Sequence, residues 1–141
     1  MNNSANIKQF QLIKFINENC DDDHLISKIS IVLRRDKIEA PYYMDSKIRL
    51  STCIDRQENG LIHAMNLLNH NRMHNLTEDT YYEIESLILD AFDGKSESDK
   101  EKIFKDEKRI KIVLTSTNNE ETRNLFENYH ELFDKIDNLV D

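Results

Sequence analysis

The sequence contains very little glycine, proline or cysteine, and no tryptophan. Of its 141 residues, 2 are Gly, 1 is Pro and 2 are Cys. A loop that cradles phosphates needs several glycines, because the backbone amides must approach the ligand without side chains between them. Gly60 and Gly94 alone cannot build such a loop, which excludes P-loop and dinucleotide-binding enzymes. No other catalytic motif stands out, and we expect no cofactor.

Long apolar runs are missing as well. No run approaches the roughly 18 residues that a membrane-spanning helix needs. The opening residues, Met-Asn-Asn-Ser-Ala-Asn, lack the charged and then apolar layout of a signal peptide. Cys20 and Cys53 lack metal-finger spacing, and we expect them to be reduced thiols that behave as small buried apolar residues. These features predict a cytoplasmic protein without a membrane partner.

What the chain does contain is enough apolar material for one modest core. Hydrophobic residues make up 38% of the sequence, which argues against wholesale disorder. The length is typical of one domain, so residues 1–141 are interpreted as a single domain.

Apolar residues recur at the spacing of amphipathic helices through most of the chain. The predicted helices cover residues 4–19, 22–40, 45–54, 61–76, 77–93, 98–114 and 118–140. Capping patterns support two starts, Ser98 with Glu101 and Asn118 with Glu121, and Thr77 and Thr80 stand at the head of the helix over 77–93. The sequence therefore predicts an all-α, single-domain bundle of about six or seven helices.

Three segments also alternate with the period of a half-buried strand. The alternating apolar residues are centred on Ile31, Leu50 and Ile112, and residues 47–54 and 108–116 fit either a helix or a strand. The alternative fold is α+β, with a small three-stranded sheet.

Charge is distributed unevenly along the chain. The formal net charge is −8, and all of it lies in the last 82 residues. The predicted helix over 77–93 carries an acidic stripe, formed by Asp79, Glu83, Ser86, Asp90 and Asp93 at spacings of four and three residues. Tyr82 and Leu89 lie beside the stripe. Negative charge flanked by apolar side chains suits docking to a basic protein surface, whereas it disfavours nucleic acid.

Two histidines are a weak candidate for a metal site. A helix over 61–76 would place His70 and His74 one turn apart, where both could ligate one ion. The segment lacks the Glu that a zinc peptidase uses as general base. The histidines also lie opposite Leu61, Met65 and Leu68, so a solvent-exposed polar face is the favoured interpretation.

The last predicted helix contains Arg123, followed by Asn124, and His130 seven positions after the arginine. This pattern resembles the Arg-(four to six residues)-His motif of the HEPN family, helical ribonuclease domains of about this size. The resemblance implies a metal-independent ribonuclease in which Arg123 binds the scissile phosphate and His130 transfers the proton. It also implies that the site is completed across a dimer. Glu127 and Asp134 lie four residues after Arg123 and His130, so surface ion pairs explain the same residues.

The sequence thus favours a non-enzymatic, acidic protein that neutralises a basic protein partner such as a toxin or nuclease. Immunity proteins, antitoxins and phage-type inhibitors are familiar roles for small acidic chains. The predicted contact residues are Asp79, Tyr82, Glu83, Leu89, Asp90 and Asp93. The HEPN-like ribonuclease is the alternative, and an oligomerisation module comes third. No DNA partner is expected, and a homodimer is compatible with the sequence.

Overall fold

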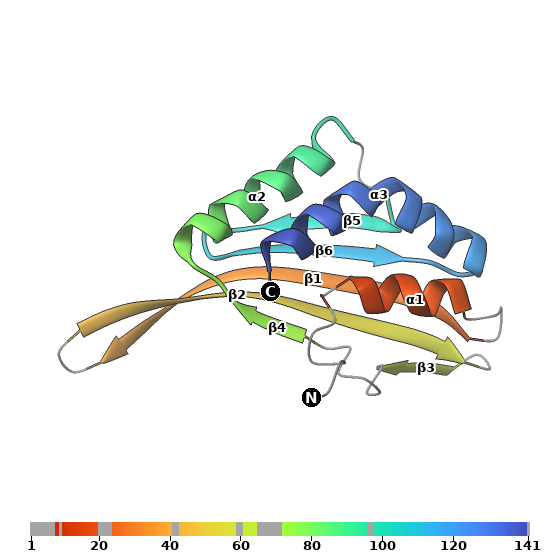
Figure 1. Ribbon diagram of the computed structural model, residues 1–141, viewed down its shortest axis with the longest axis horizontal. Helices are drawn as coiled ribbons and strands as arrows, with labels where there is room; N and C mark the ends of the chain where they lie inside the picture. The colour runs from red at the N-terminus through yellow and green to blue at the C-terminus, as the bar shows by residue number, and fades with distance from the viewer. Residues whose placement is uncertain are drawn as a thin grey trace.

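The computed structural model describes residues 8, 10–19, 24–40, 43–58, 61–64, 72–95 and 98–140. Within these residues the protein is α+β, with helices packed on one face of an antiparallel sheet (Figure 1). The helices are α1 (Gln11–Asn19), α2 (Glu78–Phe92) and α3 (Asn119–Leu139). The strands are β1 (His24–Ala40), β2 (Tyr43–Glu58), β3 (Leu61–Ala64), β4 (Arg72–Asn75), β5 (Glu101–Lys105) and β6 (Arg109–Thr115).

The sheet has the strand order β3-β2-β1-β6-β5, and β4 also pairs with β2. Every pairing is antiparallel. β1 occupies the centre, because it pairs along its whole length with β2 and over Lys28–Arg34 with β6. The far part of the β1–β2 hairpin extends beyond the other strands (Figure 1).

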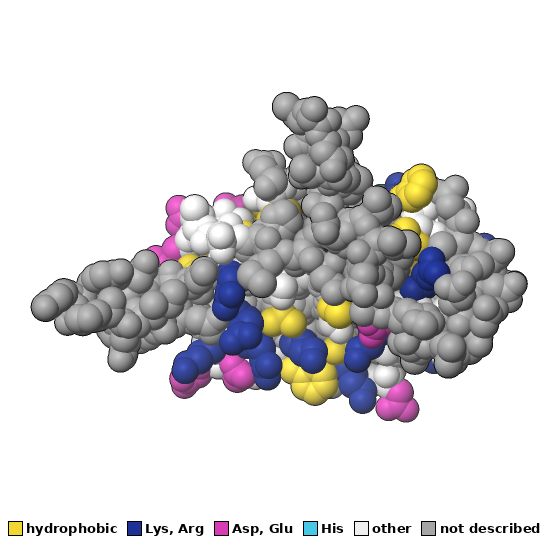
Figure 2. All heavy atoms as spheres, turned by 90° about the horizontal axis from the view of Figure 1, so that it is seen from below, with side chains coloured by type: hydrophobic (Ala, Val, Ile, Leu, Met, Phe, Trp, Pro, Cys, Tyr) yellow, Lys and Arg dark blue, Asp and Glu magenta, His cyan; other side chains and the backbone are white. Residues whose placement is uncertain are grey.

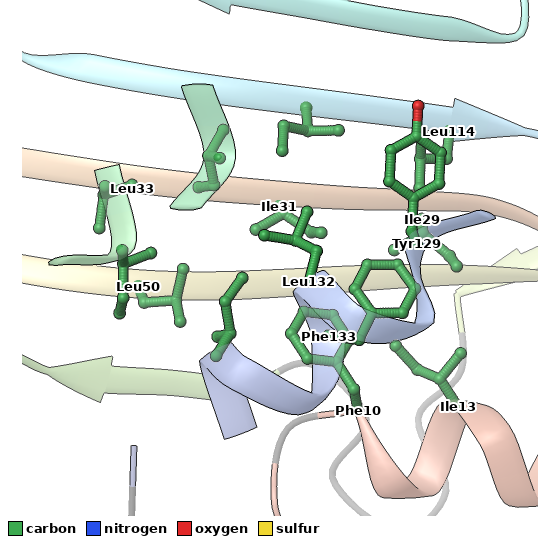
Figure 3. Close-up of a cluster of buried hydrophobic side chains, with 14 of the residues drawn as sticks. Phe10, Ile13, Ile29, Ile31, Leu33, Leu50, Leu114, Tyr129, Leu132 and Phe133 are labelled. Carbon is green, nitrogen blue, oxygen red and sulfur yellow. The ribbon is translucent and has the colours of Figure 1, made fainter. Parts of the chain in front are cut away.

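Strand alternation divides the sheet into two faces. On one face Ile31, Leu50 and Ile112 are at most 1% exposed, and the helices cover them. The buried side chains of the helices join these residues in one hydrophobic cluster (Figure 3). Within the cluster the Phe10 and Phe133 rings stack with their centroids 4.4 Å apart. Asp137 accepts hydrogen bonds from the Phe10 backbone N–H at 2.9 and 3.2 Å, which ties the start of α1 to α3.

The prediction of an all-α bundle of six or seven helices is wrong, because the structure has a six-stranded sheet and only three helices in its described part. Four of the predicted helices, over 22–40, 45–54, 61–76 and 98–114, are replaced by strands where the chain is described. The alternative α+β class is the right one. Its three alternating segments lie in β2, β1 and β6, which are neighbours in the sheet.

The predicted helix start at Ser98 shows how a local signal misled the prediction. The Ser98 hydroxyl does accept hydrogen bonds from the backbone N–H groups of Lys100 and Glu101, at 3.3 and 3.2 Å. The chain then continues as β5 rather than as a helix. A serine side chain makes the same bonds in a turn as at a helix N-terminus. Alternation in β5 also leaves Phe104 51% exposed.

Two predicted helices are confirmed together with their caps. Thr77 accepts from the Thr80 N–H at 3.2 Å at the start of α2. Asn118 accepts from the Glu121 N–H at 2.9 Å at the start of α3. α1 confirms the later part of the predicted helix over 4–19, but it begins at Gln11, so Lys8 and Phe10 precede it, and residues 4–7 and 9 lie outside the described part of the chain.

Candidate functional site

The acidic stripe lies on the outer side of α2. Tyr81, Ile84 and Ile88 point into the core and are at most 4% exposed, which fixes the rotation of the helix. The opposite side therefore faces solvent, and all the stripe residues predicted from the sequence are exposed: Asp79, Glu83, Ser86, Asp90 and Asp93. α2 contains no Lys or Arg. The stripe is thus a rigid line of negative charge.

Tyr82 lies beside the stripe and is held in place by a residue that the sequence analysis did not identify. Its ring is 51% exposed. The Arg35 guanidinium carbon lies 5.2 Å from the Tyr82 ring centroid and 4.7 Å from that of Tyr81, within the range of a cation–π contact. Arg35 also forms an ion pair with Glu78 at 3.2 Å. Hydrogen bonding to Tyr82 and the nearby negative charge raise the pKa of Arg35, so it remains cationic.

On its other side the stripe borders a groove between α2 and α3. The groove has a volume of about 450 Å³ and is lined by Glu83, Ser86, Leu87, Lys135, Asn138 and Leu139. Leu87 and Leu139 are partly buried hydrophobic residues packed against the core, so the floor of the groove is partly apolar. Leu89, predicted as a contact residue, is half-buried on the side of Tyr82. The predicted contact residues therefore form one continuous surface around α2.

Arg123 and His130 both lie on α3, as predicted, and both side chains are exposed. The His130 Nε2 atom lies 3.0 Å from the Asp134 carboxylate, as the ion-pair interpretation expects. Two turns of helix separate the arginine from the histidine, about 10 Å along the axis. The α+β fold differs from the helical domain that the HEPN resemblance implies.

The predicted helix that would have aligned the two histidines is absent from the described residues. His70 lies outside the described part of the chain, and His74 lies in β4. The strand at Arg72–Asn75 thus contradicts the helix from which the metal site was predicted, and the pairing of the two histidines falls partly outside the described residues. Among the described residues, no three His, Cys, Asp or Glu side chains are grouped closely enough to hold a metal ion.

The open face of the sheet is the second functional candidate, and the sequence analysis missed it. The open face comprises the side chains that point away from the helices. Among the side chains that the structure describes, its charged members are Lys28, Arg34, Arg49, Asp55, Lys102, Arg109 and Lys111. In this described part of the face one acid thus accompanies six bases, although the net charge of the protein is −8. In the lower part of Figure 2, Lys and Arg side chains surround hydrophobic ones, with a few Asp and Glu side chains among them.

Cys53 and Phe104 also lie on the open face. Cys53 is a free thiol and is exposed, so the expectation that it is buried is wrong. Its pKa is raised, first by partial burial and then by the nearby Asp55 carboxylate, which keeps the thiol protonated. Phe104 is on β5 opposite Lys111 of β6. An exposed ring among cations marks this face as more than an ordinary solvated surface.

None of the helices in the described part of the chain is long and apolar enough to cross a membrane. Comparisons with protein families, with curated proteins and with solved structures found no match for this chain.

Proposed function

We propose that the protein is a non-enzymatic binding protein that docks the acidic stripe onto a basic protein and neutralises it. The observation that carries this proposal is the exposure of the whole stripe along a helix that has no compensating Lys or Arg. A toxin or a nuclease is the expected kind of partner. By analogy of type, the role is that of an immunity protein, an antitoxin or a phage-type inhibitor.

The outer side of α3 adds to the same negative field. Of the six acids of α3, Asp137 is buried and Glu121 is paired with Lys100, which leaves four further acids against Arg123 and Lys135 of the same helix. Two neighbouring acidic helices attract a basic surface over a longer range than one ion pair does. Charge of this kind mainly accelerates association, while it contributes less to the lifetime of the complex.

Tyr82 and the groove supply the contacts that hold a partner after it arrives. Because Arg35 stacks on both Tyr81 and Tyr82, the exposed ring is already positioned before binding, and less side-chain entropy is lost in the complex. Tyrosines of this kind are common hot spots in protein interfaces. The groove beside Leu87 and Leu139 can receive an apolar side chain of the partner.

The test compares three versions of the purified protein, each immobilised and exposed to an extract of the native host. The first is the wild type, and the second carries Asp79→Lys, Glu83→Lys and Asp90→Lys. The third is a control with the same change in net charge, made at exposed acids outside α2 and α3: Glu18→Lys, Asp99→Lys and Glu107→Lys. Proteins that bind to the wild type and the control but not to the stripe variant are identified and purified.

Binding kinetics with the purified partner then decide the proposal. Reversing the stripe should slow association by at least about tenfold and flatten its salt dependence. Tyr82→Ala should instead speed dissociation by about tenfold, equivalent to roughly 1.4 kcal/mol. Affinity that ignores both the charge reversal and the salt concentration would show that the stripe is only a solvated helix face.

A further inference from the structure

An arginine row crosses the open face of the sheet. The register places Arg34 of β1 directly opposite Arg49 of β2 and also directly opposite Arg109 of β6. Neighbouring strands lie about 4.8 Å apart, so the Cα atoms of the three arginines lie within a span of about 10 Å. The register thus places three cationic side chains next to one another on this face, where one polyanion can contact all of them.

Arginine is particularly suited to phosphate. Its planar guanidinium presents a fork of N–H donors that matches two phosphate oxygens, whereas lysine acts as a point charge. Arg34 and Arg109 are exposed, and Arg49 is half-buried. Arg109 has a local acidic neighbour in Asp106, at 3.9 Å and exposed to solvent, and such a contact exchanges readily for a phosphate. Lys111 and Lys102 continue the positive surface towards the edge of the sheet.

Phe104 gives the open face a second kind of contact. It lies on β5 opposite Lys111, which is on the same strand as Arg109. Its ring is 51% exposed, and the half-buried Val32 and Val113 lie on the same face. An unpaired base stacks on an exposed aromatic ring, and cations beside the ring can hold the adjoining backbone. In a duplex the bases are already stacked on each other and cannot use the ring.

The negative charge of the helices does not cancel this local field. The helices cover the opposite face of the sheet (Figure 1), so their outer surfaces lie about two layers away. Screening at physiological salt acts over about 8 Å, which is less than the thickness of those layers. A polyanion that approaches the open face therefore meets mainly the basic side chains.

We propose that the open face binds single-stranded RNA, with phosphates on the arginine row and a base stacked on Phe104. This proposal does not depend on the docking of a partner to the acidic stripe. RNA is the chosen strand because single-stranded segments with accessible bases are its usual recognition target.

The experiment measures the fluorescence anisotropy of a labelled oligouridine of about 16 nucleotides, the upper end of known site sizes. The wild type should bind it, and the affinity should fall steeply as salt is raised. Replacing the row by Arg34→Gln, Arg49→Gln and Arg109→Gln should weaken binding by at least about tenfold. The same change should reduce the slope of log affinity against log salt by about two, because each phosphate contact contributes about 0.7.

Phe104→Ala separates stacking from charge. It should weaken binding by at least about fivefold and leave the salt slope unchanged. Phe15→Ala is the matched control, since it removes another exposed phenylalanine, 60% exposed, from the helical side. Arg123→Gln serves the same purpose for the arginines. If circular dichroism shows that the triple variant is unfolded, Phe104→Ala and Lys111→Gln still decide the question.

Four results would overturn the proposal. One is the absence of binding at low salt, and another is equal binding by wild type and Phe104→Ala. Displacement of the RNA by polyglutamate at matched charge would assign the face to an acidic protein. Tighter binding of oligothymidine or of duplex RNA would remove the assignment to single-stranded RNA.

Discussion

The helical layer and the open face of the sheet carry opposite charge. The acids of α2 have no basic neighbours on that helix, and α3 has five acids besides the buried Asp137 against two bases. On the open face the described side chains include six bases and Asp55. The two surfaces lie on opposite sides of one core. Each can therefore attract a different class of partner without competing with the other.

Charge in this protein therefore differs between the helical layer and the open face of the sheet, and successive segments of the sequence do not show this difference. Residues 1–59 carry equal numbers of basic and acidic side chains, so a sum along the chain shows nothing there. Strand alternation sends every second side chain of β1 and β2 to the open face. The arginine row, for example, combines a residue near position 110 with two from the first 50.

The largest expected effect is a difference in the free energy of unfolding between substitutions on the two faces of the sheet. Ile31 is 1% exposed, while its neighbour Val32 points to the open face and is half-buried. Ile31→Ala should lower the free energy of unfolding by about 2–5 kcal/mol, because it leaves a cavity in the core. Val32→Ala should lower it by less than about 1 kcal/mol. Urea denaturation of both variants checks this, and equal losses would contradict the division into core face and open face.

A smaller difference in the free energy of unfolding is expected between a buried acid and an exposed acid of α3. Asp137 is 5% exposed and accepts from the Phe10 N–H, whereas Asp134 is exposed and pairs with His130. Asp137→Ala should cost about 1–3 kcal/mol, because a buried N–H loses its acceptor. Asp134→Ala should cost less than about 0.5 kcal/mol. Similar losses in urea unfolding would show that α1 does not depend on the Asp137 contact.

The smallest effect at neutral pH comes from the contact between α3 and β5. The buried Tyr129 hydroxyl donates a hydrogen bond to the Glu101 carboxylate. Burial, and then Glu101, raise the pKa of Tyr129. Tyr129→Phe should cost about 1 kcal/mol at neutral pH, the value of one hydrogen bond.

The raised pKa of Tyr129 also predicts a dependence on pH. In the unfolded chain tyrosine titrates near pH 10. The folded form resists deprotonation, so the stability that the protonated phenol provides is fully present below about pH 10 and is lost as the pH rises further. Urea unfolding at about pH 8 and about pH 11 should therefore show the wild type and Tyr129→Phe converging. A constant difference between them would mean that Tyr129 titrates normally. Tyr81, whose pKa is also raised, is present in both proteins and cancels.

The sequence predicted α2 and α3 well because their caps and periodicity agree. It failed at β1 for a specific reason. A β-bulge between Ile26 and Lys28 shifts the register, so Leu25, Ile26 and Ile29 are all buried. That spacing is the same as one face of a helix, and the bulge cannot be inferred from the sequence alone. At Ser98 the capping bonds are real, but long-range pairing with β6 decides the secondary structure.

The same distinction applies to the candidate sites. The acidic stripe was predictable because its residues belong to one helix, whose rotation follows from its own apolar positions. Arg35 was missed because it reaches Tyr82 from β1. The arginine row was missed because it exists only once three strands are in register.

The central position of β1 also sets the order in which the protein can mature on the ribosome. Its neighbour β2 follows at once, but β6 begins at Arg109 and α3 ends at Leu139. Until β6 and α3 have been synthesised, Ile31 and Leu50 of the β1–β2 hairpin are uncovered and one edge of β1 is unpaired. An exposed strand edge of this kind can pair with other chains. The nascent protein is therefore most vulnerable to aggregation in the interval after β2 and before β6 and α3 emerge.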